Sequence, residues 1–344
     1  MTTLKLVQWN MEWLNDLFEK GDGAAQFRAD DVAPQHAKST TVKKRREELA
    51  DVIKQLDPDI VVVVEGPSRR EELALFFEKD IAGTWAVELQ TSSGGMQNLG
   101  IAVRTDRGKF EKQALKMWDT AKDSTFDPFL IDTDNDEVQE QYRFERRPLY
   151  VEIYPVDGKP FRIFGLHLKS KGIFKSYEWS KWWSMADANA KRILAQASRV
   201  RNSFLDPYLS DEKTKNIPLI VCGDINDGPG LDASEKKLFG SGVEKLMGNV
   251  WKPELCLGNA LYDTLPAHNK SSLDFSDTYT TSFRDPIFND TYQNEWIDHI
   301  LYSRNRDGWV VNGKINETLP DGNKIWKSHK HASDHFPVSV EIRL

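Results

Sequence analysis

Short apolar runs that end in polar residues are the feature of this sequence that most restricts its possible folds. The run from Ile60 to Val64 contains only isoleucine and valine and is followed directly by Glu65. Short continuous apolar runs between turn residues are typical of buried strands, and alternating runs are typical of strands with one buried face. Similar runs predict further strands in LKLVQW, NLGIAVRT, PLYVEIYPV, FRIFGLHLKS, IPLIVCGDI, EWIDHILYS and FPVSVEIRL.

Two segments between these runs have the period of an amphipathic helix. One helix is expected directly before the strand at 60–64, and an apolar stripe predicts a longer helix over about 185–205. Strands that follow one another in pairs, with few helices between them, favour an α/β fold in which two packed mixed sheets are flanked by helices. The expected architecture is therefore a four-layer α/β sandwich.

The length of 344 residues is compatible with one large domain, because two-sheet folds reach this size as single units. We expect one catalytic domain over residues 1–344. Polar or acidic stretches without a clear period indicate inserted segments, which we expect near residues 16–46, 171–185 and 231–279.

Several classes of protein are disfavoured by the composition. Two cysteines, Cys222 and Cys256, are too few for a disulfide framework. No apolar run approaches the roughly eighteen residues of a membrane-spanning helix. The first residues lack the basic segment and long apolar segment of a secretion signal. We therefore expect a cytoplasmic protein without a transmembrane segment.

Charge is distributed unevenly along the chain. The formal net charge is −7, which by itself disfavours an acidic partner such as nucleic acid. Residues 159–201, however, contain ten lysines or arginines and two acids, so this segment carries +8 and the remainder carries −15. A basic segment of this kind can bind an acidic polymer although the whole chain is acidic.

Polar side chains lie at or near the ends of several predicted strands. One carboxylate in such a place is usually a cap, and one histidine is more often structural than catalytic, so only the whole set is informative. Phosphodiester hydrolysis requires a divalent ion with oxygen ligands, a base for the attacking water and donors around the phosphate. The set provides each of these and consists of Asn10, Glu65, His167, Asp224, Asn226, Asp298, Asp334 and His335.

Two of these residues are hard oxygen donors suited to magnesium. Glu65 and Asp334 would suffice as protein carboxylates, because Mg²⁺ keeps several waters and usually takes one or two carboxylates. Neither CxxC nor HExxH occurs, which disfavours a zinc site. We expect Mg²⁺ as the cofactor, with Mn²⁺ as a possible substitute.

Six strings have the order found in a known superfamily: WNMEW, DIVVVVEG, GLHLKSK, VCGDINDGP, WIDHILYS and SDHFPV. They span residues 8 to 338, and the GDxN and SDHxP signatures are highly specific together. The chain resembles the endonuclease/exonuclease/phosphatase superfamily of DNase I, exonuclease III-type abasic-site endonucleases, bacterial sphingomyelinases and inositol polyphosphate phosphatases. Bacterial nucleases are the most similar branch. The resemblance implies a DNase I-like fold and a metal-dependent phosphoric-ester hydrolase.

The resemblance also implies how the metal would be held. Glu65 would bind the ion, and Asn10 would orient the ion or its water. Asp334 would complete or adjoin the metal shell.

Four further residues receive catalytic roles from the same resemblance. Asp224 would orient or deprotonate the attacking water, and Asn226 would hold a phosphate oxygen. His335 would stabilise the pentacovalent transition state, and Asp298 would fix the orientation of its imidazole and favour the charged form.

His167 occupies a place where some members of the superfamily have tyrosine, which implies a phosphate contact or proton donation to the leaving group. The Arg-x-Pro pattern in FERRPLYV indicates Arg146 as a phosphate ligand, although its neighbour Arg147 and an ordinary surface ion pair are alternatives. Glu12 and Asn98 are additional candidates at the same rim.

The substrate is indicated mainly by the segment that follows His167. Lys169 and Lys171 are expected to bind it, because positive charge beside aromatic rings suits a single strand or a splayed duplex end. The neighbouring basic and aromatic residues are Lys175, Lys181, Lys191, Arg192, Phe174, Tyr177, Trp179, Trp182 and Trp183.

Other interpretations of this segment remain open. The tryptophans could pack beneath an inserted loop whose lysines are solvated, or they could enter a lipid interface, as the sphingomyelinase branch suggests. The absence of a secretion signal disfavours membrane contact. We therefore predict a nuclease that acts on DNA or RNA, with an enzyme for lipid, inositol or other small phosphates as the alternative. A catalytically silent binding module is disfavoured because no residue of the set is lost.

Overall fold

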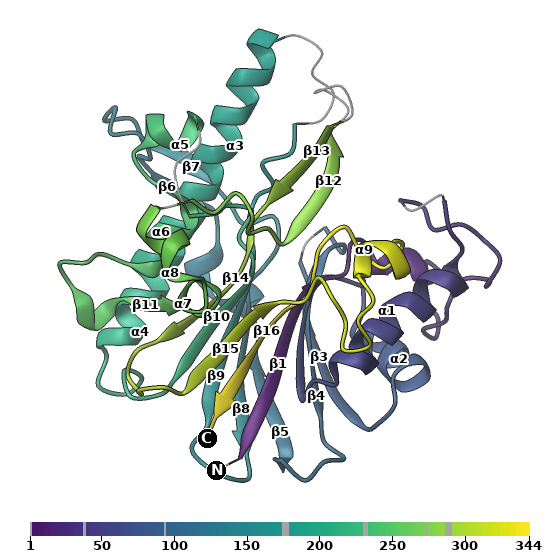
Figure 1. The fold of residues 1–344 in the computed structure, drawn as a ribbon. Coiled ribbons are helices and arrows are strands. Elements are labelled where there is room, and N and C mark those ends of the chain that lie inside the picture. The colour runs from purple at the N-terminus through teal and green to yellow at the C-terminus, as the bar shows by residue number, and fades with distance from the viewer. Residues whose placement is uncertain are drawn as a thin grey trace.

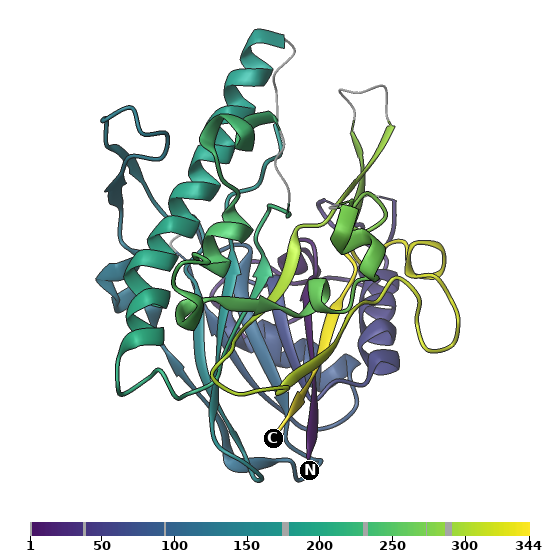
Figure 2. The same ribbon diagram turned by 60° about the vertical axis from the view of Figure 1, so that its left-hand side comes forward.

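The computed structural model describes residues 2–36, 39–92, 94–173, 179–229, 233–272, 274–285 and 291–344. Two six-stranded β-sheets pack face to face in its centre, and helices cover the outer face of each sheet (Figures 1 and 2). This architecture confirms the predicted four-layer α/β sandwich.

The first sheet has the strand order β15-β16-β1-β2-β4-β3. Its strand β1 (Thr3–Asn10) is parallel to β2 (Ile60–Gly66) and antiparallel to β16 (Val338–Arg343). Strand β2 is buried along its whole length, as its continuous Ile-Val run predicts. The remaining strands of this sheet are β3 (Trp85–Gln90), β4 (Asn98–Arg104) and β15 (Val310–Ile315).

The second sheet has the order β11-β14-β10-β9-β8-β5. Its strand β10 (Leu219–Asp224) is parallel to β9 (Phe161–His167) and antiparallel to β14 (Asp298–Ser303). At Gly223 of β10, a Cβ atom would lie 1.9 Å from the carbonyl oxygen of Leu166, so only glycine fits there. The remaining strands are β5 (Phe110–Trp118), β8 (Leu149–Pro155) and β11 (Leu257–Asn259).

Long helices cover both sheets. Helices α1 (Val42–Leu56) and α2 (Arg70–Asp80) lie on the first sheet, and α3 (Trp179–Val200) lies on the second (Figure 1). Helix α3 continues through a π-helical turn, Arg201–Leu205, into α4 (Asp206–Ser210). The helix predicted over about 185–205 is thus present, but it begins earlier, at Trp179, within the segment 171–185 where an insertion was expected.

Shorter elements fill the connections. Two hairpins pair β6 (Phe129–Ile131) with β7 (Glu140–Tyr142) and β12 (Thr281–Asp285) with β13 (Thr291–Glu295). The short helices are α5 (Ala233–Leu238), α6 (Gly242–Met247), α7 (Ala260–Asp263), α8 (Ala267–Ser272) and α9 (Ile325–Ser328). Single 3₁₀ turns span Leu14–Leu17, Thr120–Lys122, Ser124–Phe126 and Pro253–Leu255.

The segment 231–279, where an insertion was expected, contains regular secondary structure. Its described part contains four short helices, and its strand β11 pairs with the edge of the second sheet. Helices of four to six residues complete fewer than two turns, so an apolar period cannot be recognised in the sequence.

Apolar side chains form three layers between the sheets and helices. In β2, Val62 belongs to the core between the two sheets, whereas Val61 and Val63 pack on the other face with Leu49 of α1 and Phe76 of α2. A third layer joins the second sheet to α3. Over the described ranges, no helix is long and apolar enough to cross a membrane.

Candidate active site

The polar strand ends predicted from the sequence meet at one rim of the sandwich. Because β1 is parallel to β2 and β9 is parallel to β10, the carboxyl ends of each pair lie at the same edge of their sheet. Helix α3 and the β12-β13 hairpin project beyond the sheets at this end of the molecule (Figure 1). The rim carries Asn10, Glu65, His167 and Asp224, together with Asp298 at the start of β14 and the loop residues Asp334 and His335.

Hydrogen bonds connect the two sheets at the rim. The Asn10 amide nitrogen Nδ2 donates to Asp224 Oδ2 at 3.0 Å, and Gln8 Nε2 donates to Asp298 Oδ1 at 3.0 Å. All four side chains are buried. The position of each carboxylate therefore depends on how the two sheets are aligned.

His335 and Asp298 form a buried pair. The His335 Nδ1–H group donates to Asp298 Oδ2 at 2.7 Å, and the other ring nitrogen, Nε2, lies 3.8 Å from Asp334 Oδ1 and 4.0 Å from Asp224 Oδ2. Burial opposes the charge on the imidazole, but Asp298 and the other carboxylates outweigh it and hold the pKa of His335 well above its ordinary value. His335 is therefore positioned as a cation.

Asp224 is held between two amides. Besides the bond from Asn10, it accepts the backbone N–H of Asn226 at 2.9 Å, and the Asn226 side-chain amide donates to the Leu168 carbonyl at 3.2 Å. Burial, and next the negative charge of Asp298, raise the pKa of Asp224 to about 7. A carboxyl group with this pKa can exchange a proton near neutral pH.

His167 has the opposite charge preference to His335. The guanidinium of Arg146 lies against its ring, with Nε 3.1 Å from Nδ1 and Nη2 2.7 Å from Nε2. Burial, and next the charge of Arg146, lower the pKa of His167 well below its ordinary value. Its Nε2 atom lies 3.8 Å from Glu65 Oε1 and 3.7 Å from Asp224 Oδ2.

Arg146 and Arg147 point to different surroundings. Arg146 contacts His167, whereas Arg147 forms an ion pair with Asp127, with 2.9 Å between Nη2 and Oδ1. The structure thus places Arg146 at the rim and Arg147 outside it. Asn98 is buried and bonds backbone groups of neighbouring loops.

Carboxylates gather on the remaining side of the rim. The Glu65 side chain accepts the backbone N–H of Trp13 at 2.9 Å. Burial, and next the charge of Asp334, raise the pKa of Glu12 to about 7. The Asp334 side chain is 44 % exposed, unlike the His335 side chain beside it, so this carboxylate is in contact with solvent.

These oxygen donors are of the kind that a hard divalent cation takes as ligands. Burial and the neighbouring charges of Asp334 and Glu65 disfavour the charged form of Glu12, and a bound divalent cation would favour that charged form. Glu65, Asp334 and the amide of Asn10 offer the hard ligands that Mg²⁺ prefers.

Several residues with left-handed backbone lie at this rim. Four of its non-glycine residues have positive φ angles: 42° at Glu12, 54° at Trp13, 56° at Glu65 and 56° at Asn226. Such angles are unfavourable for side chains other than glycine, asparagine and aspartate, and persist where surrounding contacts impose them.

Arg45 is a residue that the sequence analysis missed. It is fully buried, and its Nη2 donates to the carbonyl oxygen of Met11 at 3.2 Å and to that of Glu12. It thereby holds the strained turn that carries Glu12. No sequence signal distinguished it, because it is one of four consecutive basic residues, KKRR, at the start of α1.

Several lysines of the basic segment are neutralised by acids. Lys171 Nζ lies 2.6 Å from Asp227 Oδ1 and 2.5 Å from Glu235 Oε1, and Lys191 Nζ lies 2.6 Å from Asp134 Oδ2. The sequence pattern could not reveal these pairs because the acids lie far away in the chain.

Lys169 remains near the rim. Burial, opposed by the charge of Glu145, lowers its pKa, and its Nζ donates to the Ser170 carbonyl at 2.9 Å. The predicted contacts at Phe174, Lys175 and Tyr177, and the side chain of Trp179, lie outside the described residues.

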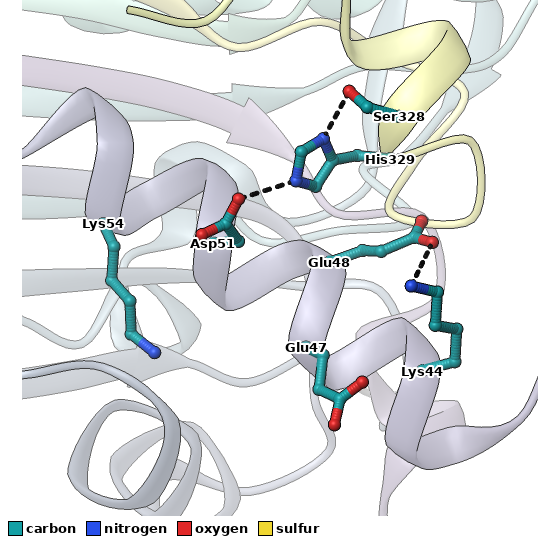
Figure 3. Close-up of a pocket in the computed structure, with 7 residues that line it drawn as sticks. All are labelled: Lys44, Glu47, Glu48, Asp51, Lys54, Ser328 and His329. Carbon is teal, nitrogen blue, oxygen red and sulfur yellow. Dashed lines mark hydrogen bonds and ion pairs between the residues drawn. The ribbon is translucent and has the colours of Figure 1, made fainter. Parts of the chain in front are cut away.

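Two other clusters lie outside the rim. Among the described residues, the only closely spaced trio of potential metal ligands is Asp132, Asp134 and Asp136, beside the β6-β7 hairpin, and Lys191 already pairs with it. A hollow of about 340 Å³ is lined by residues of α1 and by Ser328 and His329 (Figure 3).

The second cluster resembles a Ser-His-Asp arrangement. Ser328 Oγ lies 2.8 Å from His329 Nδ1, and His329 Nε2 lies 2.8 Å from Asp51 Oδ2 (Figure 3). The Ser328 hydroxyl also lies 3.0 Å from the Lys324 carbonyl oxygen, a second acceptor that competes with His329 for its single proton. The cluster connects α1 to the loop after α9.

Comparison with known proteins agrees with the fold. No curated protein matches the sequence. Truncated TDP2 from Caenorhabditis elegans has a TM-score of 0.50 at 13 % identity, with 99 % of this chain and 98 % of that chain covered. D. rerio TDP2, complexed with a single-strand DNA product, has a TM-score of 0.50 at 12 % identity, with both chains fully covered at 100 %. The human Nocturnin catalytic domain with bound sulfate has 16 % identity and a TM-score of 0.48 and covers 99 % of this chain and 93 % of that chain.

A family profile matches nearly the whole sequence. Residues 7–335 match the profile of the Endonuclease/Exonuclease/phosphatase family. This range includes the strand ends of the rim from Asn10 to His335. A protein of this family with this fold is a phosphoric-ester hydrolase of the phosphodiesterase or nuclease type. The chain therefore belongs to the Endonuclease/Exonuclease/phosphatase family.

Proposed function

We propose that the protein is a magnesium-dependent nuclease that hydrolyses phosphodiester bonds of DNA or RNA. The observation that carries this proposal is the position of Asp224. Its carboxylate lies between the amides of Asn10 and Asn226, within 4.0 Å of a neutral and a charged histidine, and its pKa is about 7. A base with these neighbours suits the removal of a proton from an attacking water at neutral pH.

The other residues of the rim would contact the phosphate and the leaving group or orient the side chains that do so. Protonated His335 would donate to a phosphate oxygen as negative charge develops there, and Asp298 keeps its ring oriented. Neutral His167, supported by Arg146, lies where it can bind another oxygen or the leaving group. Asn226 would help to hold the phosphate.

The proposed metal ligands are Glu65, Asp334 and the amide of Asn10, and Glu12 lies beside them. When bound, Mg²⁺ supplies positive charge that stabilises the phosphate oxygens in the transition state, and Mn²⁺ can take the same ligands. Oxygen donors alone form this group, which agrees with a hard cation.

Nucleic acid is the substrate that the surroundings of the rim favour. Lys169 and Arg146 give positive charge beside His167, and Trp183 of the projecting helix α3 is 47 % exposed. Stacking surfaces next to cationic groups suit single strands. The D. rerio TDP2 structure contains a single-strand DNA product, which supports the same substrate class for this fold.

A substrate panel tests the proposal. Supercoiled, linear and single-stranded DNA, RNA, sphingomyelin and inositol phosphates are each incubated with Mg²⁺, Mn²⁺ or EDTA. We expect cleavage of DNA or RNA that EDTA abolishes, and a loss in kcat of about 10²–10⁴-fold in Asp224→Asn. The matched control is Asp211→Asn, which changes an exposed carboxylate after α4 and should leave kcat unchanged.

Three outcomes would contradict the proposal. Cleavage in EDTA would refute the metal requirement, and full activity of Asp224→Asn would refute the assigned base. Turnover of only the lipid or small phosphates would refute nucleic acid as the substrate.

A further inference from the structure

The turn after β1 places an aromatic residue beside a proposed metal ligand. Glu12 and Trp13 both have positive φ angles, and such angles are rare for a residue as bulky as tryptophan. The Trp13 backbone N–H donates to Glu65 Oε2 at 2.9 Å. Contacts at the rim therefore fix the position of Trp13 relative to Glu65.

The inserted segment 16–46 supplies a second ring for this residue. The imidazole of His36 stacks on the Trp13 indole, with 4.0 Å between the ring centres and 16° between the planes. His36 is held by Asp16, which accepts the His36 backbone N–H at 2.7 Å and lies 3.0 Å from its Nδ1. The Asp16 side chain is buried, so this anchor is fixed in the protein.

The two stacked rings are not part of the hydrophobic core. Leu14, Leu17 and Phe18 of the same turn belong to the core beneath α1, whereas Trp13 and His36 do not. Trp13 is partly exposed, and the His36 side chain is 33 % exposed. Both residues thus keep part of their surface in contact with solvent, and the backbone of Trp13 contacts the proposed metal ligand Glu65.

We propose that Trp13 and His36 form a platform on which a nucleobase next to the scissile phosphate stacks. This inference rests on the proposed function, because it assigns the substrate contact of the same site. Every base has a flat π face, so an aromatic platform binds nucleic acid without selecting a sequence. Inositol phosphates carry no flat π face and would gain nothing from stacking on the platform, whereas the choline group of sphingomyelin could contact the indole only as a cation and not as a stacked base.

Binding is measured first, in metal-free buffer so that no strand is cut. The probes are a fluorescein-labelled single-stranded oligodeoxynucleotide and a strand of equal length in which tetrahydrofuran replaces every base, and fluorescence anisotropy gives both Kd values. We expect Trp13→Leu and His36→Ala each to raise the Kd of the base-bearing strand about ten-fold and to leave that of the abasic strand unchanged.

Conservative and remote variants complete the design. Trp13→Phe and His36→Phe keep a flat ring and should restore most of the affinity for the base-bearing strand. Trp251→Leu changes a tryptophan that is 87 % exposed and lies between α6 and the Pro253–Leu255 turn, and it should bind as the wild type does. Thermal unfolding of each variant checks that folding is intact.

Cleavage of the same two strands with Mg²⁺ separates the inference from the proposed function. Base-dependent binding that disappears in Trp13→Leu supports the platform, even if neither strand is cut and the nuclease assignment fails. Cleavage with equal Kd values for both strands overturns the platform and leaves the nuclease assignment intact. An equal rise in the Kd of both strands in Trp13→Leu and His36→Ala also overturns the platform, because residues with a merely structural role would have that effect.

Discussion

Two histidines at the rim show how neighbours set the charge of chemically identical side chains. Both are buried: the carboxylate of Asp298 outweighs burial and raises the pKa of His335, whereas burial, and next the charge of Arg146, lower the pKa of His167. Two environments of opposite sign thus give one site both a cationic donor and a neutral imidazole.

Asp298→Asn should lower kcat on the order of 100-fold or more, because the amide can still orient His335 but no longer favours its charge. His335→Ala should cost a similar factor. Since the two residues act together, the double variant should lose little beyond either single variant, and steady-state kinetics of all three measure this. If the fold-losses in kcat of the two single variants multiply in the double variant, the two residues act independently.

His299 gives a prediction about stability and pH. It is buried, its Nε2 lies 2.9 Å from the Asp227 carbonyl, and burial lowers its pKa to about 4. Because an unfolded histidine titrates near pH 6.5, the unfolded state binds the extra proton between about pH 6.5 and 4. The contribution of neutral His299 to the free energy of unfolding is therefore complete above pH 6.5, and it is lost as the pH falls towards 4.

Urea unfolding of wild type and His299→Gln between pH 4.5 and 7.5 tests this. Relative to the variant, the wild type should lose roughly 2–3 kcal/mol of unfolding free energy as the pH falls through this window. Parallel curves for the two proteins would refute the assignment.

Individual residues differ in how far the sequence could reveal them. The motif positions from Asn10 to His335 were recognisable because their types and order suffice, and the structure brings these residues together at one rim. Arg45 was hidden within a basic run, and the pairing of Lys171 with Asp227 and Glu235 depends on contacts between distant parts of the chain.

Helix α1 connects the site loops at the scale of elements. Its Arg45 bonds the turn after β1, and its Glu48 side chain accepts the backbone N–H of His331 at 2.8 Å. One turn further, Asp51 pairs with His329. Because His329 and His331 lie shortly before Asp334 in the chain, helix α1 contacts both the turn that carries Glu12 and the loop that leads to Asp334.

Glu48→Ala should therefore lower kcat about ten-fold or more through a displaced Asp334 and His335, while substrate KM changes less. The control is Glu47→Ala, because Glu47 is an exposed carboxylate of the same helix and lines the same hollow. Equal kinetics for the two variants would show that the loop keeps its position without Glu48.

Strand β10 depends on one glycine. Gly223→Ala would place its new methyl carbon 1.9 Å from the Leu166 carbonyl oxygen, so β9 and β10 would have to separate. We expect a loss of more than about 3 kcal/mol or failure to fold, as chemical denaturation would reveal. In Gly108→Ala, the control, φ is also positive at +67° but the surrounding space is open, so only about 1–2 kcal/mol should be lost. Similar losses at both glycines would contradict the steric explanation.

Elements with strong periodicity were predictable, and short ones were not. Strand β2 and the core of α3 were evident from apolar runs and stripes, whereas α5 to α8 are too short to repeat a pattern. Helices α5 and α6 pack against α3, and α7 packs against β14 and β15, and a local pattern does not encode such contacts.

The whole molecule brings carboxylates from distant parts of the chain together, so bound metal should stabilise it. At a hundred-fold excess over its Kd, Mg²⁺ should add about 2.7 kcal/mol to the free energy of unfolding and raise Tm by a few degrees. Differential scanning calorimetry with Mg²⁺ or EDTA measures the effect, which Glu65→Gln should greatly reduce. An equal shift in that variant would place the ion elsewhere.

Each sheet is centred on one pair of parallel strands whose ends reach the rim. The β1-β2 pair brings Asn10 and Glu65, and the β9-β10 pair brings His167 and Asp224. Neither half holds a complete site, and a displacement of about 1 Å between reacting groups can cost 100-fold in rate. The value of kcat is therefore sensitive to how the two sheets are positioned relative to each other. A small shift of one sheet against the other would lower kcat while every helix and strand, and hence the circular dichroism spectrum, stays unchanged.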